Sequence, residues 1–87
     1  MSQLQADASG SREPLQLMLR PSCMLCLEAE YALSQAGIDR FERIDIERAD
    51  GFEARYGTRI PVLVRADGAE LDWPFNVQAV REFVVLG

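Results

Sequence analysis

The chain has 87 residues, of which 48% are hydrophobic and 26% are charged. A chain of this length supports one small hydrophobic core and is too short for two, so we expect a single domain. Its formal net charge of -5 argues against nucleic acid as a partner, because phosphate binding requires a concentrated basic surface. No apolar stretch approaches the length that crosses a bilayer, and the N-terminus lacks the basic-then-apolar layout of a secretory signal. We therefore expect a cytoplasmic protein with no membrane partner.

Residues 1–13 are small and polar without a hydrophobic period, which predicts a disordered N-terminal tail. The folded domain is expected over residues 14–87. It opens with a strand over Leu15–Leu19, apolar at almost every position, as is typical of a central strand covered on both faces. Apolar residues then recur at helical spacing and end at Gly37, which suits a left-handed helix cap. These helical positions are Cys26, Ala29, Leu33 and Ala36.

A second strand and a short helix follow. The strand is predicted over residues 41–46, with Ile44 and Ile46 on the same side. A strand, helix and strand of this length form a βαβ unit, whose crossover is nearly always right-handed. The short helix is marked by Ala49, Phe52 and Tyr56 and closes at Gly57.

The last third of the chain predicts a hairpin and then a helix. A third strand is expected over residues 60–64, and the turn signal Asp67-Gly68 returns Glu70 and Leu71 antiparallel to it. An apolar stripe with a capping residue before it predicts a C-terminal helix. The stripe is Val77, Val80 and Val84 with Phe83 beside it, and the cap is Asp72 or Asn76. The complete order is β-α-β-α-β-β-α in one α/β domain.

The only two cysteines form a Cys-x-x-C motif, Cys23-Met24-Leu25-Cys26, between the first strand and the first helix. Positions i and i+3 share a helix face, so two sulfurs placed there can close a short disulfide. A cysteine in the first helical turn also faces unpaired backbone N–H groups and the positive end of the helix dipole, which favour the thiolate. On this reasoning Cys23 is the attacking thiolate, and Cys26, more buried, is the resolving thiol.

Other roles for the two cysteines stay open. A zinc site within one protomer needs two further ligands, and the chain has no histidine and no third cysteine, so we expect no metal. A permanent structural disulfide would close so small a loop that it would constrain the unfolded chain little. Two buried, inert cysteines are a further alternative. Because cytoplasmic thiols are kept reduced, a cysteine pair in that compartment is more often catalytic than structural.

The element order and the position of the motif resemble the thioredoxin fold, and within it the glutaredoxin-like group. The likeness covers residues 14–87 and depends on three places. One is Arg20, three positions before Cys23, where glutaredoxins also carry a basic residue. The others are Arg-Ile-Pro-Val-Leu at residues 59–63, similar to the cis-proline loop of the family, and the hairpin at residues 64–70. The resemblance implies a four-stranded mixed sheet of strand order 2-1-3-4 flanked by three helices.

The resemblance also implies roles around the cysteine pair. Arg20 would help to hold the thiolate charge and would attract an acidic substrate such as glutathione. A cis peptide bond would precede Pro61, and Ile60 would offer its backbone N–H and C=O to an extended, cysteine-containing ligand. A trans proline that merely opens an edge strand is the alternative.

Two places depart from the pattern of the family. Met24 and Leu25 stand where glutaredoxins usually carry Pro-Tyr and thioredoxins Gly-Pro, and the bulky residues 71–76 replace the glycines that grip glutathione. The chain is most similar to a smaller family of short glutaredoxin-like proteins with a Trp-Pro-Phe element. Trp73 and Phe75 in this element are candidates for a lip beside the cysteine groove. Packing under the last helix is the alternative, because aromatic residues usually serve the core.

Two functional hypotheses follow. The first is a thiol-disulfide oxidoreductase, in which Cys23 attacks a substrate disulfide and Cys26 releases the product from the mixed disulfide. Its partner is a disulfide-containing protein or a small thiol; it needs no cofactor, and glutathione is a candidate reductant. The second is a redox-silent binding module for a protein or thiol ligand, with an iron-sulfur-bridged dimer as a variant. We expect a monomer.

Overall fold

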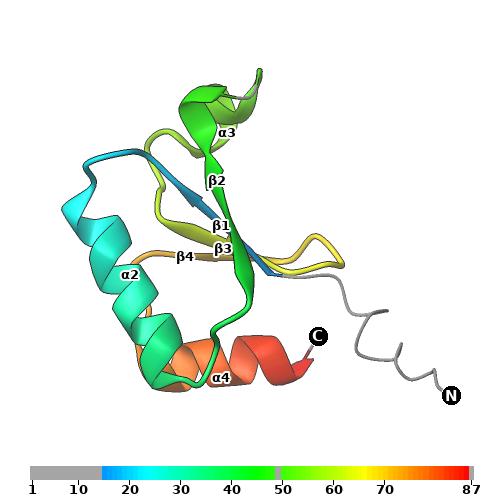
Figure 1. Ribbon diagram of the computed structural model, residues 1–87. Helices are drawn as coiled ribbons and strands as arrows, with labels where there is room; N and C mark the ends of the chain where they lie inside the picture. Colours follow the sequence, from blue (N-terminus) through cyan, green and yellow to red (C-terminus); the bar gives the residue numbers. More distant parts are fainter. Residues whose placement is uncertain (1–14, 49, 87) are drawn as a thin grey trace, which may run out of the picture.

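A computed structural model describes residues 15–48 and 50–86 of the chain (Figure 1). The tail predicted over residues 1–13 lies outside the described residues, and so does Ala49. The described chain follows the predicted order of strands and helices, with one additional 3₁₀ turn. The elements are β1 (Leu15–Leu19), α2 (Met24–Gln35), β2 (Phe41–Asp45), η1 (Ile46–Arg48), α3 (Phe52–Tyr56), β3 (Val62–Val64), β4 (Glu70–Asp72) and α4 (Val77–Leu86). None of the described helices is long and apolar enough to cross a membrane.

The four strands form one mixed sheet in the order β2-β1-β3-β4, which confirms the predicted strand order. Strand β1 pairs in parallel with β2 and antiparallel with β3, and β4 pairs antiparallel with β3. Leu19 pairs with Asp45 and Met18 pairs with Val62. The last residues of β1 and β2 and the first residue of β3 therefore meet at one end of the sheet. We call this end the cysteine end, because the chain runs from it into the Cys-x-x-C motif.

Alternate side chains of the central strands pack into separate cores on the two faces of the sheet. Leu17 and Leu63 are fully buried on the face covered by α2 and α4, which lie next to each other in Figure 1. Met18, Val62 and Val64 point to the other face, which η1 and α3 cover. Side chains on a strand alternate between faces, so the continuous apolar runs of β1 and β3 supply both cores. The other buried residues are Ala29, Ala32, Leu33, Phe75 and Val80 in the first core, and Ile46 and Tyr56 in the second.

Two predicted strand ends were wrong by one or two residues. Ile46 was expected to end the second strand, but it begins η1, because the Asp45 carboxylate accepts a hydrogen bond from the Glu47 N–H at 2.9 Å and turns the chain. Ile46 nevertheless stays buried in the second core. The third strand was expected from Ile60, but it begins at Val62, because the Ile60 N–H donates to the Tyr56 carbonyl at 3.0 Å.

The predicted turn and cap residues hold the positions that their chemistry requires. Gly37 follows α2 with φ of 85°, and Gly68 in the hairpin has φ of 94°, both in the left-handed region that favours glycine. At the start of α4, the Asn76 side chain accepts a hydrogen bond from the Ala79 N–H at 2.8 Å. Asn76, and not Asp72, is therefore the capping residue of the last helix.

Candidate active site

Cys23 is the N-cap residue of α2. Its backbone is extended, and its Sγ accepts a hydrogen bond from the Cys26 N–H at 3.1 Å. An N-cap side chain normally satisfies one of the unpaired N–H groups of the first turn with an oxygen atom, and here a sulfur atom does so. This contact and the positive end of the helix dipole both favour a negative charge on Cys23. The turn that leads into this position includes Ser22, which has a positive φ of 59°.

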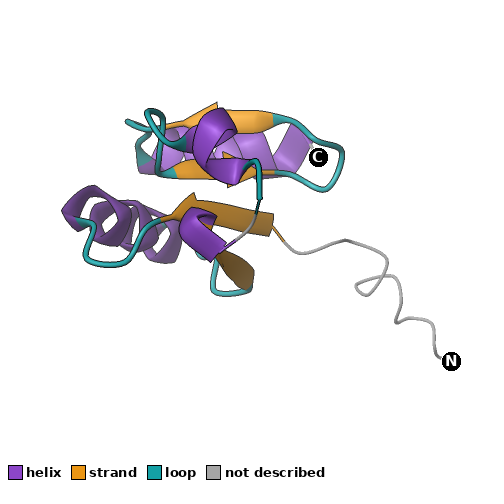
Figure 2. Ribbon diagram, turned by 90° about the horizontal axis from the view of Figure 1, so that it is seen from above, coloured by secondary structure: helices purple, strands orange, loops and turns teal. Residues whose placement is uncertain are grey.

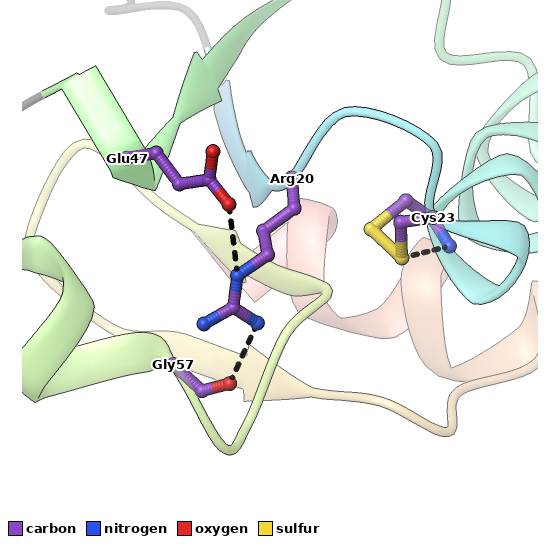
Figure 3. The surroundings of a disulfide bond; sticks show 5 residues. Arg20, Cys23, Glu47 and Gly57 are labelled. Atoms are coloured by element: carbon purple, nitrogen blue, oxygen red, sulfur yellow. Dashed lines mark hydrogen bonds and ion pairs between the residues drawn. A yellow bond between two sulfur atoms is a disulfide. The ribbon is translucent and has the colours of Figure 1, made fainter.

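The two cysteine sulfurs lie within disulfide distance of each other, as Figure 3 shows. The Cα atoms of Cys23 and Cys26 are 5.2 Å apart, which is ordinary for a disulfide. Cys26 is only 3% exposed, whereas Cys23 is half-buried. A substrate sulfur therefore has better access to Cys23 than to Cys26. Among the described residues, no group of three or more His, Cys, Asp and Glu residues is placed to hold a metal ion.

The guanidinium of Arg20 is held on the far side of its loop from the cysteine pair. It forms an ion pair with Glu47 at 3.4 Å and another with Glu53, and it donates to the Gly57 carbonyl at 3.1 Å. Figure 3 shows the side chain directed toward η1 and α3 and away from Cys23. Two carboxylates thus balance the charge of Arg20, and its contacts link the end of β1 to α3.

The peptide bond between Ile60 and Pro61 is cis, as the resemblance implied, and the alternative of a trans proline was wrong. Pro61 directly precedes Val62, which pairs with Met18 near the end of β1. The cis-proline loop therefore lies at the cysteine end of the sheet, as does the loop that leads to Cys23. The side chain of Pro61 is fully buried, so it offers no surface of its own to a ligand.

The backbone groups of the cis-proline loop are partly engaged already. The Ile60 N–H was expected to face a ligand, but it donates to Tyr56. Within the described residues no backbone N–H donates to the Ile60 C=O, which leaves this carbonyl as the candidate for strand-like pairing. The Pro61 carbonyl accepts a hydrogen bond from the Trp73 N–H at 3.0 Å, which ties the loop to the segment after β4. A second cis bond, between Trp73 and Pro74, lies in that segment and was not predicted.

Trp73 and Phe75 form an edge-to-face pair with ring centroids 5.0 Å apart. Phe75 is 7% exposed and belongs to the core under α2 and α4, so its position matches the packing alternative. Trp73 is half-buried and packs against the same core. Of the two rings, Trp73 is therefore the one that a ligand can still reach.

Comparison with known proteins places this geometry in a family. A family model described as "Glutaredoxin-like domain (DUF836)" matches residues 14–84. The chain belongs to this glutaredoxin-like family. A search of curated proteins finds no match.

Two solved structures share the glutaredoxin-like fold of the chain. The X-ray structure of Northeast Structural Genomics target protein XcR50 from X. campestris is 38% identical over 84% of this chain and 97% of that chain, with a TM-score of 0.78. The solution structure of XcR50 is 37% identical over 86% of this chain and 96% of that chain, with a TM-score of 0.80. The thioredoxin-like arrangement of three helices and four strands is thus shared with XcR50, a relative that is 37–38% identical in sequence.

In this glutaredoxin-like domain, a cluster of charged residues fixes the chain just before the cis-proline loop. Arg59 binds Glu70 at 2.5 Å and Asp72 at 2.7 Å, both on β4. Arg55 binds Glu70 at 2.7 Å, and the Tyr56 hydroxyl donates to the same carboxylate at 3.1 Å. The two arginines hold the pKa of Glu70 at about 2, below its ordinary value of 4.5. This cluster was not predicted, although alternating acids on a strand opposite two arginines can signal one.

The depressed pKa of Glu70 predicts a loss of stability in acid. A carboxylate whose pKa is lower in the folded chain stabilises the fold above its unfolded pKa, and this stabilisation disappears as it becomes protonated. We therefore expect the contribution of Glu70 to be complete above about pH 4.5 and to be lost as the pH falls toward about 2. The measurement is the free energy of unfolding in urea across this range.

The matched variant is Glu70→Gln, which should be less stable than the native chain near neutral pH and should lose less stability on acidification. Glu82→Gln, which removes an exposed carboxylate on α4, is the control and should follow the native curve. Parallel acid profiles for the native chain and Glu70→Gln would contradict the assignment.

Proposed function

We propose that this glutaredoxin-like protein is a thiol-disulfide oxidoreductase with Cys23 as the nucleophile and Cys26 as the resolving thiol. The observation that carries the proposal is the hydrogen bond from the Cys26 N–H to the Cys23 sulfur at the start of α2. A thiolate accepts such a bond better than a thiol does, so in the reduced pair the contact favours the thiolate form of Cys23. The difference in burial between the two sulfurs supports the division of roles.

The proposed cycle uses only the two cysteines and an external thiol. The Cys23 thiolate attacks one sulfur of a substrate disulfide; a new S–S bond forms and the other substrate sulfur leaves as a thiolate. Cys26 loses its proton and attacks the Cys23 sulfur, which releases the second substrate sulfur and leaves the Cys23–Cys26 disulfide. Two external thiol molecules, with glutathione as a candidate, reduce this disulfide and are themselves oxidised to a disulfide, which restores the reduced pair. The cytoplasm, where thiols are kept reduced, is the compartment that fits this direction of exchange.

The test is the pH dependence with which iodoacetamide alkylates Cys23. In a Cys26→Ser variant only Cys23 reacts, and mass spectrometry follows the adduct. We expect a midpoint between about pH 3.5 and 7, the range of activated cysteines, instead of about 8.5 for a free thiol. The Cys23→Ser variant is the control, because its remaining thiol is buried and should react slowly. A midpoint near that of free cysteine would remove the premise of the proposal.

Turnover separates this function from the alternative of a redox-silent binding module. The oxidoreductase should reduce a disulfide substrate repeatedly when either glutathione or a thioredoxin-type reductase supplies electrons. A binding module would show no turnover with either donor and an equilibrium potential far from that of the cytosolic thiol pool. A colourless protein after anaerobic expression with added iron would count against the iron-sulfur dimer.

A further inference from the structure

Helix α2 carries exposed apolar residues on the side opposite its buried face, beside the polar Glu28, Ser34 and Gln35. One face, with Cys26, Ala29 and Leu33, is buried against the sheet and α4. On the other face lie Met24, Leu27 and Tyr31, with exposed fractions of 72%, 61% and 67%. We call these three residues the α2 stripe. A surface helix normally carries polar residues on its outer face, and Figures 1 and 2 both show α2 at the periphery of the molecule.

The α2 stripe continues directly from the reactive sulfur. Leu27 follows Cys23 by four positions and Tyr31 follows Leu27 by four, so the three lie on one side of the helix. The Leu27 N–H donates to the Cys23 carbonyl at 3.2 Å, and helical side chains lean toward the N-terminus, so Leu27 leans toward Cys23. From Cys23 to Tyr31 the stripe extends about 12 Å along the helix axis. An extended segment of about four residues covers the same distance, whereas a single cysteine does not.

The charges near Cys23 do not favour a small anionic thiol. Every arginine that the structure describes at the cysteine end is already paired with carboxylates, and the chain as a whole is acidic. Arg40, before β2, lies at the opposite end of the sheet, and Arg81 donates to the Gln35 carbonyl at the far end of α2. Glutathione, which carries two carboxylates, would therefore gain little electrostatic attraction beside Cys23. The pairs at the cysteine end are Arg20 with Glu47 and Glu53, Arg48 with Asp45, and Arg59 with Asp72 as well as Glu70.

We propose that the α2 stripe binds the substrate, and that the substrate is a polypeptide whose reactive cysteine is flanked by apolar side chains. The inference rests on the proposed thiol-disulfide exchange, because the bond between Cys23 and the substrate sulfur decides which molecule lies on the stripe. Burial of one or two apolar side chains against Leu27 and Tyr31 provides the affinity. The substrate class is thus set by the outer face of α2 and not by a cationic pocket.

The experiment compares three probes that carry the same leaving group. These are a five-residue peptide with leucine and phenylalanine around its cysteine, a matched peptide with serine and glutamine there, and glutathione, each as a disulfide with 5-thio-2-nitrobenzoate. In the Cys26→Ser variant, the Cys23 thiolate attacks the probe sulfur; the new S–S bond forms, and coloured 5-thio-2-nitrobenzoate leaves as a thiolate. The second-order rate constant is measured for each probe.

We expect the apolar peptide to react at least about tenfold faster than the other two probes, as burial of an apolar side chain allows. Adding Leu27→Gln and Tyr31→Gln should remove this preference and leave the rates of the polar peptide, of glutathione and the alkylation midpoint unchanged. Val85→Gln, which alters an exposed apolar residue on α4, should preserve the preference.

Equal rates for the three probes would overturn the inference and leave the proposed function intact, whereas no reaction with any probe would overturn both. A stripe covered by a second copy of the chain is the competing arrangement. It would appear in sedimentation as a dimer that Leu27→Gln dissociates, and that result would also overturn the inference.

Discussion

Replacing Cys23 by serine is expected to abolish disulfide reduction, with a loss of rate of more than about a thousandfold, because a hydroxyl cannot replace the thiolate as nucleophile. Replacing Cys26 by serine should instead leave the first step and prevent the second. Without added thiol, the Cys26→Ser variant should accumulate one substrate molecule per chain as a mixed disulfide on Cys23. Mass spectrometry of the adduct and release of product thiol measure the two steps.

The fold itself should survive the substitution at Cys23. Serine is among the best N-cap residues, and its Oγ can accept the Cys26 N–H bond that the sulfur now accepts. The control is therefore the urea unfolding curve of the reduced chain, which should change little in Cys23→Ser. Substantial turnover in Cys23→Ser, or a mixed disulfide on Cys26 in its place, would show that the roles are assigned wrongly.

A second large effect is expected from one of two leucines on the same helix. Leu33 is fully buried in the core under α2, whereas Leu27 is 61% exposed. Leu33→Ala should lower the free energy of unfolding by about 2 to 5 kcal/mol, since it removes buried methyl groups and leaves a cavity. Leu27→Ala should change it by no more than about 0.5 kcal/mol, as is usual for surface positions.

Urea unfolding of both variants under identical conditions measures this difference. Because the two substitutions share the same chemistry and the same helix, helix propensity cancels in the comparison. Equal losses would mean that Leu27 is part of the core and would remove the exposed stripe from consideration as a binding surface. A neutral Leu27→Ala, by contrast, would show that stability does not require leucine at this position.

Most of the fold was predictable because residues close together in the sequence determine where its helices and turns begin and end. Gly37 has the positive φ expected for a left-handed cap, and Asn76 caps α4 as one of the two candidate residues. The end of β2 before Ile46 and the start of β3 after Ile60 were less predictable, since a single hydrogen bond determines each of these boundaries. The Asp45 carboxylate that turns the chain at Ile46 is a local signal, because aspartate often bonds the backbone two residues on.

The parts of the site that depend on the Cys-x-x-C motif were predictable. The parts that depend on contacts between residues far apart in the sequence were not. The place of Cys23 at the helix start followed from the Cys-x-x-C motif, and the cis bond before Pro61 followed from the resemblance. The carboxylates that bind Arg20 come from η1 and α3, and nothing in the residues around Arg20 indicates them. The α2 stripe has a signal in the sequence, apolar residues at i, i+3 and i+7, but periodicity does not tell which of two apolar faces is buried.

Among the described strands, β2 and β4 form the two edges of the sheet, and the charged cluster on β4 protects one of them. Edge strands expose unpaired backbone groups that can recruit a strand from another molecule, and charged side chains oppose this. Strand β4 is short and carries Glu70 and Asp72 in ion pairs with arginines, while β2 exposes Glu42 and Arg43. A strand from another molecule could pair with these edges only if the charged side chains were desolvated, which costs free energy. The ion pairs of Glu70 and Asp72, which hold the chain before Pro61, therefore also oppose aggregation through the β4 edge at high protein concentration.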